Sequence, residues 1–312
     1  MNEVLFPFPR SNHIVGVLTR PDSAAQRVDP PAVVLVNAGF VHRVGPNRIH
    51  VKLARRLAAL GFPVLRFDFS GIGDSRSRRD DVPFDQQSIV EIEEALDQMS
   101  AAGLAQRFLL AGICSGATNS LRVARHDRRV VGAALINGVW KLGLDSSEIK
   151  QLHSARYYRR LAVLDPRSWI RVMTGRSNYR VILRTAARSL ASRYRRHKPQ
   201  PVQERSENSE LSDFRAVVES GAHLLLVCSE RDRSHTVLTA MAGPLAELRA
   251  TDRFRSEVIR DADHTFDLCC HQREVIDLLC GWAESVADSP PVSPIANVAE
   301  AKGSQTLTLG AP

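Results

Sequence analysis

A cysteine stands between two closely spaced glycines where an apolar run leads into a predicted helix. Residues 109–117 read Leu-Leu-Ala-Gly-Ile-Cys-Ser-Gly-Ala, so Gly112 and Gly116 flank Cys114 in the spacing of a nucleophile elbow. A strand that turns sharply into a helix strains the central residue, and only hydrogen-sized neighbours avoid a collision there. We expect the helix N-terminus to lower the pKa of the Cys114 thiol, and the N–H of Ser115 to face any oxyanion.

Two other interpretations of this segment stay open. Small residues also surround buried turns for packing alone, so the motif by itself is weak. Ser115 is an alternative nucleophile, but its register, Ile113-Cys-Ser-Gly-Ala117, lacks both flanking glycines. The spacing therefore favours Cys114.

Polar side chains follow a later apolar run, and others precede the last predicted helix. The run 224–228 reads as a strand and is followed by Ser229-Glu-Arg-Asp232, while Asp263 and His264 stand just before the final helix. His223 lies ahead of that strand. These residues supply carboxylates and an imidazole, the groups that activate a nucleophile.

The elements that must position these residues alternate along the chain. Continuous apolar runs predict buried strands at 32–36, 64–67, 130–136, 224–228 and 254–259, a strand at 108–111 leading into the elbow, and an edge hairpin from 4–8 and 13–18. Helical periodicity predicts helices at 47–60, 88–102, 236–248 and 274–286. The pattern predicts an α/β fold with a mostly parallel, doubly wound sheet.

A basic segment interrupts this alternation. Residues 140–214 are predicted to form a helical cap, with helices at 154–164, 169–174 and 178–196 and a return linker at 198–213. Residues 141–200 hold fifteen Lys or Arg and three acids, a net +12 against +8 for the whole chain, which leaves −4 elsewhere. Such a surface is either solvated or a docking site for something acidic. The predicted domains are a core at 1–139 and 215–287, the cap at 140–214 and a disordered tail at 288–312.

The composition indicates the size of the core, the kinds of site to expect and the cellular compartment of the protein. The chain of 312 residues is 44% hydrophobic, enough for a full core. Its five cysteines show neither zinc nor disulfide spacing, and the glycines at 71 and 73 fall short of a dinucleotide fingerprint, so we expect neither metal nor cofactor. No signal peptide or transmembrane segment is evident. We expect a soluble protein in the reducing cytoplasm, which would keep Cys114 as a free thiol.

Taken together, residues 4–286 resemble the α/β-hydrolase superfamily. Within it, five motifs look like bacterial hydrolases associated with exosortase or acyl-carrier gene clusters: Asn37-Ala-Gly, His42-Arg-Val-Gly-Pro-Asn47, Leu65-Arg-Phe-Asp68, Gly71-Ile-Gly-Asp-Ser75 and Gly112-Ile-Cys-Ser-Gly-Ala117. The resemblance implies the α/β-hydrolase fold with a helical cap. Cysteine at the usual position of serine is the departure from the commonest pattern, although dienelactone hydrolases and some thioesterases share it.

The resemblance also implies roles, because the family carries its triad in the order nucleophile, acid, histidine. It would make Cys114 the nucleophile, Asp232 the acid and His264 the base. Glu230 is the alternative acid. For His264, the alternative to a role as the base is a purely structural role in its loop. The loop after the strand at 32–36 would supply the second oxyanion N–H from Gly39 or Phe40, beside that of Ser115. Asp68 and Asp74 read as parts of a structural turn.

A cysteine nucleophile narrows the reaction. Attack on a thioester exchanges one thioester for another at nearly equal free energy, whereas an oxygen ester or amide would give a higher-energy acyl-enzyme. We expect an acyl-thioester hydrolase or acyltransferase whose donor is an acidic acyl carrier protein, docked on the basic cap, or an acyl-coenzyme A, with no nucleic-acid partner. The alternatives are a carboxylic ester or lactone hydrolase and a non-catalytic binding protein of the same fold.

Overall fold

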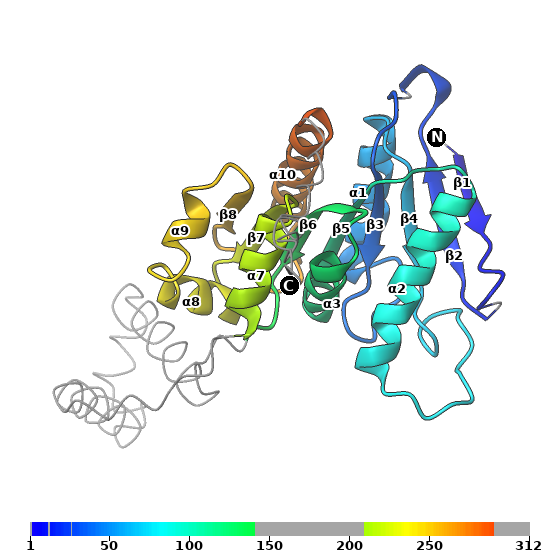
Figure 1. Ribbon diagram of the computed structural model, residues 1–312, viewed down its shortest axis with the longest axis horizontal. Helices are drawn as coiled ribbons and strands as arrows, with labels where there is room; N and C mark the ends of the chain where they lie inside the picture. Colours follow the sequence, from blue (N-terminus) through cyan, green and yellow to red (C-terminus); the bar gives the residue numbers. More distant parts are fainter. Residues whose placement is uncertain (1, 12, 26, 141–208, 290–312) are drawn as a thin grey trace, which may run out of the picture.

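The central strands of one eight-stranded sheet consist mainly of consecutive apolar residues. This is the composition expected of strands that are buried on both faces. The computed structural model describes residues 2–11, 13–25, 27–140 and 209–289. The sheet has the order β1-β2-β4-β3-β5-β6-β7-β8, in which β1 pairs with β2, and β2 with β4, in antiparallel fashion and all later pairs are parallel (Figure 1). The strands are β1 (Asn2–Phe6), β2 (Gly16–Arg20), β3 (Ala32–Val36), β4 (Val64–Phe67), β5 (Phe108–Ile113), β6 (Val130–Ile136), β7 (His223–Ser229) and β8 (Phe254–Ile259).

Helices cover both faces of the sheet, which gives three layers (Figure 1). Side chains alternate along each strand, so Val33 and Leu35 of β3 join the core beneath α1 (Ile49–Ala59) and α10 (Cys269–Asp288). Val34 and Val36 join the core on the opposite face. That face is covered by α2 (Phe84–Ala101), α3 (Ser115–His126), α7 (Ser209–Glu219), α8 (Arg233–Ala240) and α9 (Ala246–Arg249). The short turns η1 (Ser23–Ala25) and η2 (Pro46–Arg48) lie in loops.

The doubly wound, mostly parallel sheet is confirmed. Strands β3, β4, β6 and β8 have the predicted bounds. The edge hairpin forms with its strands two to three residues away from their predicted ends. The single helix predicted over 236–248 is wrong: α8 and α9 are separate, because Pro244 lacks the N–H that a continuous helix would use. The last helix reaches Asp288, one residue into the predicted tail.

Residues 209–213, predicted in a linker, instead begin α7. Phe214 on that helix is buried and packs edge-on against Trp140, with ring centroids 5.2 Å apart, so the chain leaves and re-enters the core at neighbouring points. The predicted cap helices and nearly all of the tail lie outside the described residues. No helix in the described part of the chain is long and apolar enough to cross a membrane.

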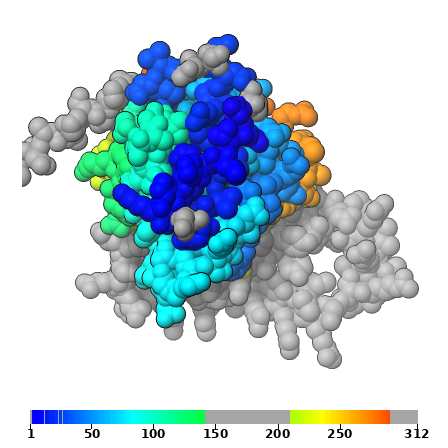
Figure 2. All heavy atoms as spheres, turned by 90° about the vertical axis from the view of Figure 1, so that its right-hand side faces the viewer, coloured from blue at the N-terminus to red at the C-terminus, as the bar shows by residue number. Residues whose placement is uncertain are grey.

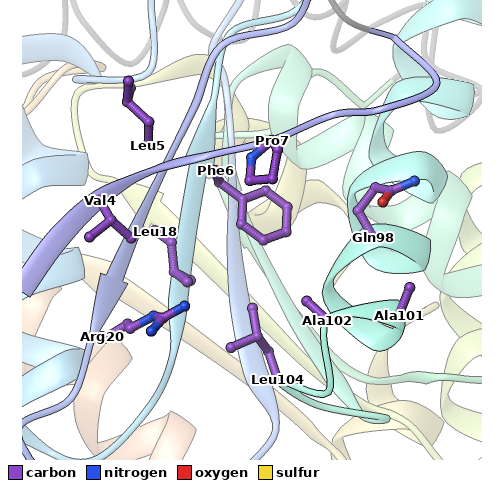
Figure 3. A pocket seen from close by; sticks show the side chains of 10 residues that line it. All are labelled: Val4, Leu5, Phe6, Pro7, Leu18, Arg20, Gln98, Ala101, Ala102 and Leu104. Carbon is purple, nitrogen blue, oxygen red and sulfur yellow. The ribbon is translucent and has the colours of Figure 1, made fainter.

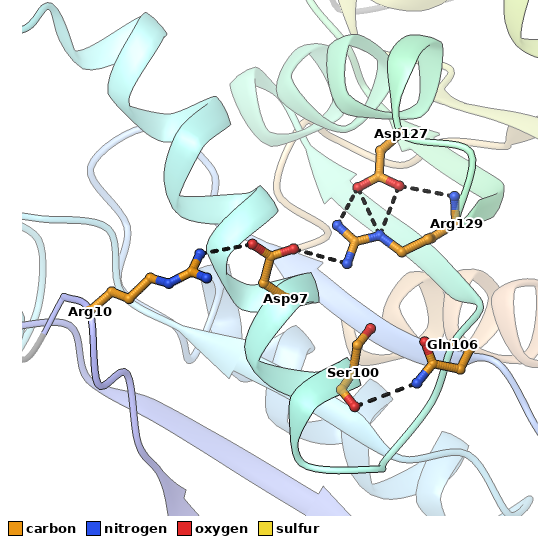
Figure 4. Close-up of polar contacts among 6 residues, drawn as sticks. All are labelled: Arg10, Asp97, Ser100, Gln106, Asp127 and Arg129. Carbon is orange, nitrogen blue, oxygen red and sulfur yellow. Dashed lines mark hydrogen bonds and ion pairs between the residues drawn. The ribbon is translucent and has the colours of Figure 1, made fainter.

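Ion pairs join distant segments on the surface near the start of β6. Asp97 on α2 contacts Arg10 at 3.0 Å and Arg129 at 2.9 Å, and Arg129 also pairs with Asp127 at 2.6 Å (Figure 4). These side chains are partly exposed, so each pair stabilises the fold by at most about 1 kcal/mol. They hold the N-terminal segment beside α2.

The antiparallel edge of the sheet carries a surface hollow. The N-terminal hairpin faces the viewer in Figure 2, and Figure 3 shows the hollow between that hairpin and the end of α2. Its volume is about 340 Å³, and its lining includes Phe6, Leu18 and Ala101, with Arg20 beside them. None of the candidate site residues lines it, so the chemistry proposed from the sequence belongs elsewhere.

Candidate active site

Cys114 occupies a sharp turn between β5 and α3. Its φ of 59° and ψ of −118° are strained for a residue with a side chain. A Cβ added to Gly112 would lie 2.2 Å from the backbone of Gly116, and one added to Gly116 would lie 2.6 Å from the carbonyl oxygens of Val36 and Asn37. Both glycines are therefore required for steric reasons, as the spacing predicts.

The half-buried Cys114 thiol lies against His264. A hydrogen bond with the His264 imidazole lowers the pKa of Cys114, and the backbone N–H of Ser115 acts in the same direction. By contrast, burial raises the pKa of Cys228 and of Cys280 to about 12. All five cysteines are free thiols. Cys114 is thus a thiol whose surroundings favour the nucleophilic thiolate.

Asp232 orients the same imidazole from its other side. The distance from His264 Nδ1 to Asp232 Oδ2 is 2.7 Å, while Asp232 Oδ1 accepts the N–H of Ser234 at 2.8 Å as the N-cap of α8. Burial acts to raise the pKa of Asp232, but its hydrogen bonds with His264 and Ser234 lower it overall. Hydrogen bonds with Asp232 and with Cys114 raise the pKa of His264 to about 10.

The other acidic and imidazole candidates make different contacts. Glu230 Oε2 accepts the backbone N–H of Asp261 at 3.0 Å and so holds the loop after β8. His223 begins β7, at the end of the strand opposite to the one that leads to Asp232. The structure brings Cys114, Asp232 and His264 together at the carboxyl ends of parallel strands, where ligands of open α/β sheets bind.

The loop after β3 lies beside the elbow. The N–H of Gly39 donates a hydrogen bond to Ser115 Oγ at 2.7 Å, and the φ of +51° at this residue suits glycine. This N–H, predicted to face an oxyanion, is thus bonded to the Ser115 hydroxyl. The N–H of Phe40, the other predicted donor, makes no hydrogen bond within the described residues. The Phe40 ring is exposed and lies 6.2 Å from that of Phe84.

Loops around the site are braced by polar residues whose contacts the sequence did not reveal. The buried Asp68 carboxylate accepts the N–H and guanidinium of Arg43 and the N–H of Asp74, in line with the structural role predicted for it. Asn47 Nδ2 donates to Thr265 O at 3.1 Å, and Asp263 accepts three bonds from Thr265 and Asp267. In the sequence, these contacts are indicated only by the presence of Asn and Asp next to turns in the loops.

Metal ions in proteins are held by groups of His, Cys, Asp or Glu side chains. Within the described residues, no three such side chains are grouped so that they would hold a metal ion. What the arrangement provides is a thiol, an imidazole and a carboxylate in hydrogen-bonded series. Such a series can activate a sulfur nucleophile and then an acceptor.

Comparisons with known proteins agree with the fold described above. A model of the Alpha/beta hydrolase family matches residues 33–276. Solved structures with similar folds include the alpha/beta hydrolase GrgF from Penicillium (TM-score 0.55, 14% identity, 92% of this chain and 98% of that chain covered) and a proline iminopeptidase from Mycobacterium smegmatis (0.53, 15%, 92% and 99%). A dienelactone hydrolase from Anabaena variabilis is also similar (0.53, 13%, 91% and 96%). These identities show the fold alone, and no curated protein matches the sequence significantly.

Proposed function

The chain belongs to the alpha/beta hydrolase family and has its fold, and from this premise we propose that it is an acyl-thioester hydrolase or acyltransferase. In this proposal Cys114 is the nucleophile, His264 the base and Asp232 the acid that orients it. The chain would then be a cysteine-nucleophile member of the family. A reducing compartment such as the cytoplasm would keep its thiol available.

The contact of Cys114 with His264, itself bonded to Asp232 at 2.7 Å, is the observation that carries the proposal. The Cys114 thiolate attacks the acyl carbon, the carbon–sulfur bond to the donor breaks, and the donor thiolate takes a proton from His264. Water or another acceptor then loses a proton to His264 as it attacks the acyl-cysteine, and Cys114 leaves as the thiolate. The proton that His264 gives to the leaving thiolate of the acyl donor is thus replaced by the proton that it takes from the acyl acceptor.

An anionic thioester donor suits the charge of the chain. The net +12 over residues 141–200 favours an acidic acyl carrier protein or the phosphates of coenzyme A. During attack, the N–H groups of Ser115 and Phe40 would stabilise the oxyanion. Loss of one such donor typically costs about 10²–10³ in kcat.

Intact-protein mass spectrometry with acyl-coenzyme A thioesters of several chain lengths, and with matched free esters, tests the proposal. We expect an acyl adduct on the wild type that maps to Cys114 and is missing in Cys114→Ala. Cys269→Ser is the control, because it removes an exposed thiol outside the site. Adducts from free esters alone would favour the ester or lactone hydrolase. Neither adduct nor product from any donor would favour a non-catalytic binding protein.

A further inference from the structure

We propose that Asn137, the first residue after β6, is a positioning residue that holds the loops of His264 and Asp232 in place against Cys114. This inference rests on the proposed roles of those three residues. The Asn137 side chain is only 1% exposed. Its amide bonds to the loops and not to the thiol or the imidazole ring, so its effect is transmitted through the loops.

The Asn137 amide uses its full hydrogen-bonding capacity on these loops. Its Nδ2 donates to the carbonyl oxygen of His264 at 2.9 Å and to Ser229 Oγ at 2.8 Å. Its Oδ1 accepts the backbone N–H of Ser229 at 2.7 Å and the hydroxyl of Ser234 at 3.3 Å. Two donors and two acceptor sites are all that an amide side chain offers.

These partners bracket the two other members of the triad. Ser229 ends β7 and Ser234 lies in the first turn of α8, so Asp232 is held between two contacts of the same amide. The bond to the His264 carbonyl fixes the backbone from which the imidazole projects. A single side chain therefore connects the acid and the base in addition to their own hydrogen bond.

The backbone beside Asn137 extends the connection to the nucleophile. Ile136 O accepts the N–H of Cys114 at 2.9 Å, and the N–H of Asn137 donates to Val227 O at 2.8 Å. The φ of Asn137 is +47°, a left-handed conformation that asparagine tolerates better than most residues. The Asn137-Gly138 pair after a buried strand reads as a turn in the sequence, which gives no hint of these contacts.

The pH dependence of iodoacetamide alkylation at Cys114, followed by peptide mass spectrometry, measures this positioning without a known substrate. Asn137→Gly is the main variant, because glycine keeps the left-handed backbone and removes only the amide. Asn137→Ala removes the amide and adds backbone strain. Asn119→Ala is the matched control: this buried amide bonds to Ser88 on α2, away from His264.

We expect both Asn137 variants to raise the alkylation midpoint toward that of an ordinary thiol, about 8.5. At a pH well below both midpoints, the rate would then be lower by about tenfold for each pH unit by which the midpoint rises. Asn137→Ala should unfold at a lower temperature than Asn137→Gly with a similar midpoint, and Asn119→Ala should keep the wild-type midpoint. If the Asn137 variants do not fold, Ser229→Ala should shift the midpoint in the same direction by less.

The outcomes separate this inference from the proposed function. An unchanged midpoint in folded Asn137→Gly, with a low midpoint in the wild type, overturns the positioning role and leaves the proposed function standing. An ordinary midpoint in the wild type itself would overturn both, because the Cys114–His264 interaction would then not favour the thiolate. A raised midpoint in Asn119→Ala as well would also overturn the role, since any buried amide would then suffice.

Discussion

The backbone N–H of Gly39 donates a hydrogen bond to the hydroxyl of Ser115, across 2.7 Å. The residue next to the proposed nucleophile therefore occupies a donor that the resemblance would assign to the oxyanion. This contact does not use the N–H groups of Ser115 and Phe40, which are the other proposed donors to the oxyanion. Ser115 thus affects the site through its side chain as well as its backbone.

Removal of this hydroxyl gives the first prediction. Ser115→Ala frees the Gly39 N–H and removes no backbone donor, so we expect kcat/KM on an accepted thioester to stay within about tenfold of the wild type, since only loss of a donor costs about 10²–10³. Steady-state kinetics measures this. A fall of about 10²-fold or more would instead identify the Ser115 hydroxyl as a donor to the oxyanion.

The two candidate acids can be separated by matched amide substitutions. Asp232→Asn removes the carboxylate that orients His264, and in a serine protease the equivalent change lowers kcat about 10⁴-fold. We expect a loss of similar order here. Glu230→Gln should change kcat by less than about threefold, because Glu230 bonds to the Asp261 backbone. Comparable losses in both variants would contradict the assignment of Asp232.

The same pair predicts how stability depends on pH. The pKa of Asp232 is lowered, so its contribution is present above its unfolded value near 3.9 and is lost as pH falls through its folded value. The pKa of His264 is raised to about 10, so its contribution is full below about 6.5 and is lost as pH rises toward 10.

We therefore expect the cost of Asp232→Asn in unfolding free energy to be largest between about pH 4 and 6.5 and to shrink on both sides. The His264 side chain is 38% exposed, so solvent screening limits this cost to about 1 kcal/mol. Urea unfolding across this pH range, compared in a Cys114→Ala background, provides the measurement. A cost that grows steadily toward pH 10 would contradict it.

The elbow glycines give a prediction about stability. In Gly116→Ala the new methyl group would meet two carbonyl oxygens at 2.6 Å, and backbone cannot give way as a flexible side chain can. We expect a loss of about 1–3 kcal/mol in unfolding free energy. Gly281→Ala on α10 is the control: its methyl group meets nothing within 4 Å, so helix propensity predicts a gain of up to about 1 kcal/mol. Equal effects at both positions would refute the steric argument.

Local sequence patterns predict much of this fold because strands buried on both faces are encoded as short apolar runs. Ala32–Val36 and Val130–Ile136 form strands with their predicted bounds for this reason. At α8 and α9 the helical periodicity runs through Pro244, but the proline separates the two helices. Local propensity fails where one residue breaks an otherwise regular pattern.

Local sequence patterns likewise predict some features of the candidate site and not others. The sharp turn at Cys114 is predictable because it places a local steric requirement on the neighbouring glycines. The proximity of Asp232 to His264 followed from the order of motifs in a family. The Gly39–Ser115 bond joins residues 76 positions apart and depends on one side-chain rotamer, so no local pattern encodes it.

The contact between Trp140 and Phe214 closes the core where the basic segment begins and ends. Because the two anchor points are adjacent in space, the length of the intervening chain hardly affects the free energy of the core: each doubling of a loop costs only about 0.6 kcal/mol. Insertions and deletions there are therefore nearly neutral for folding. The sheet and the turn that carries Cys114 can therefore stay the same when the length of this segment changes.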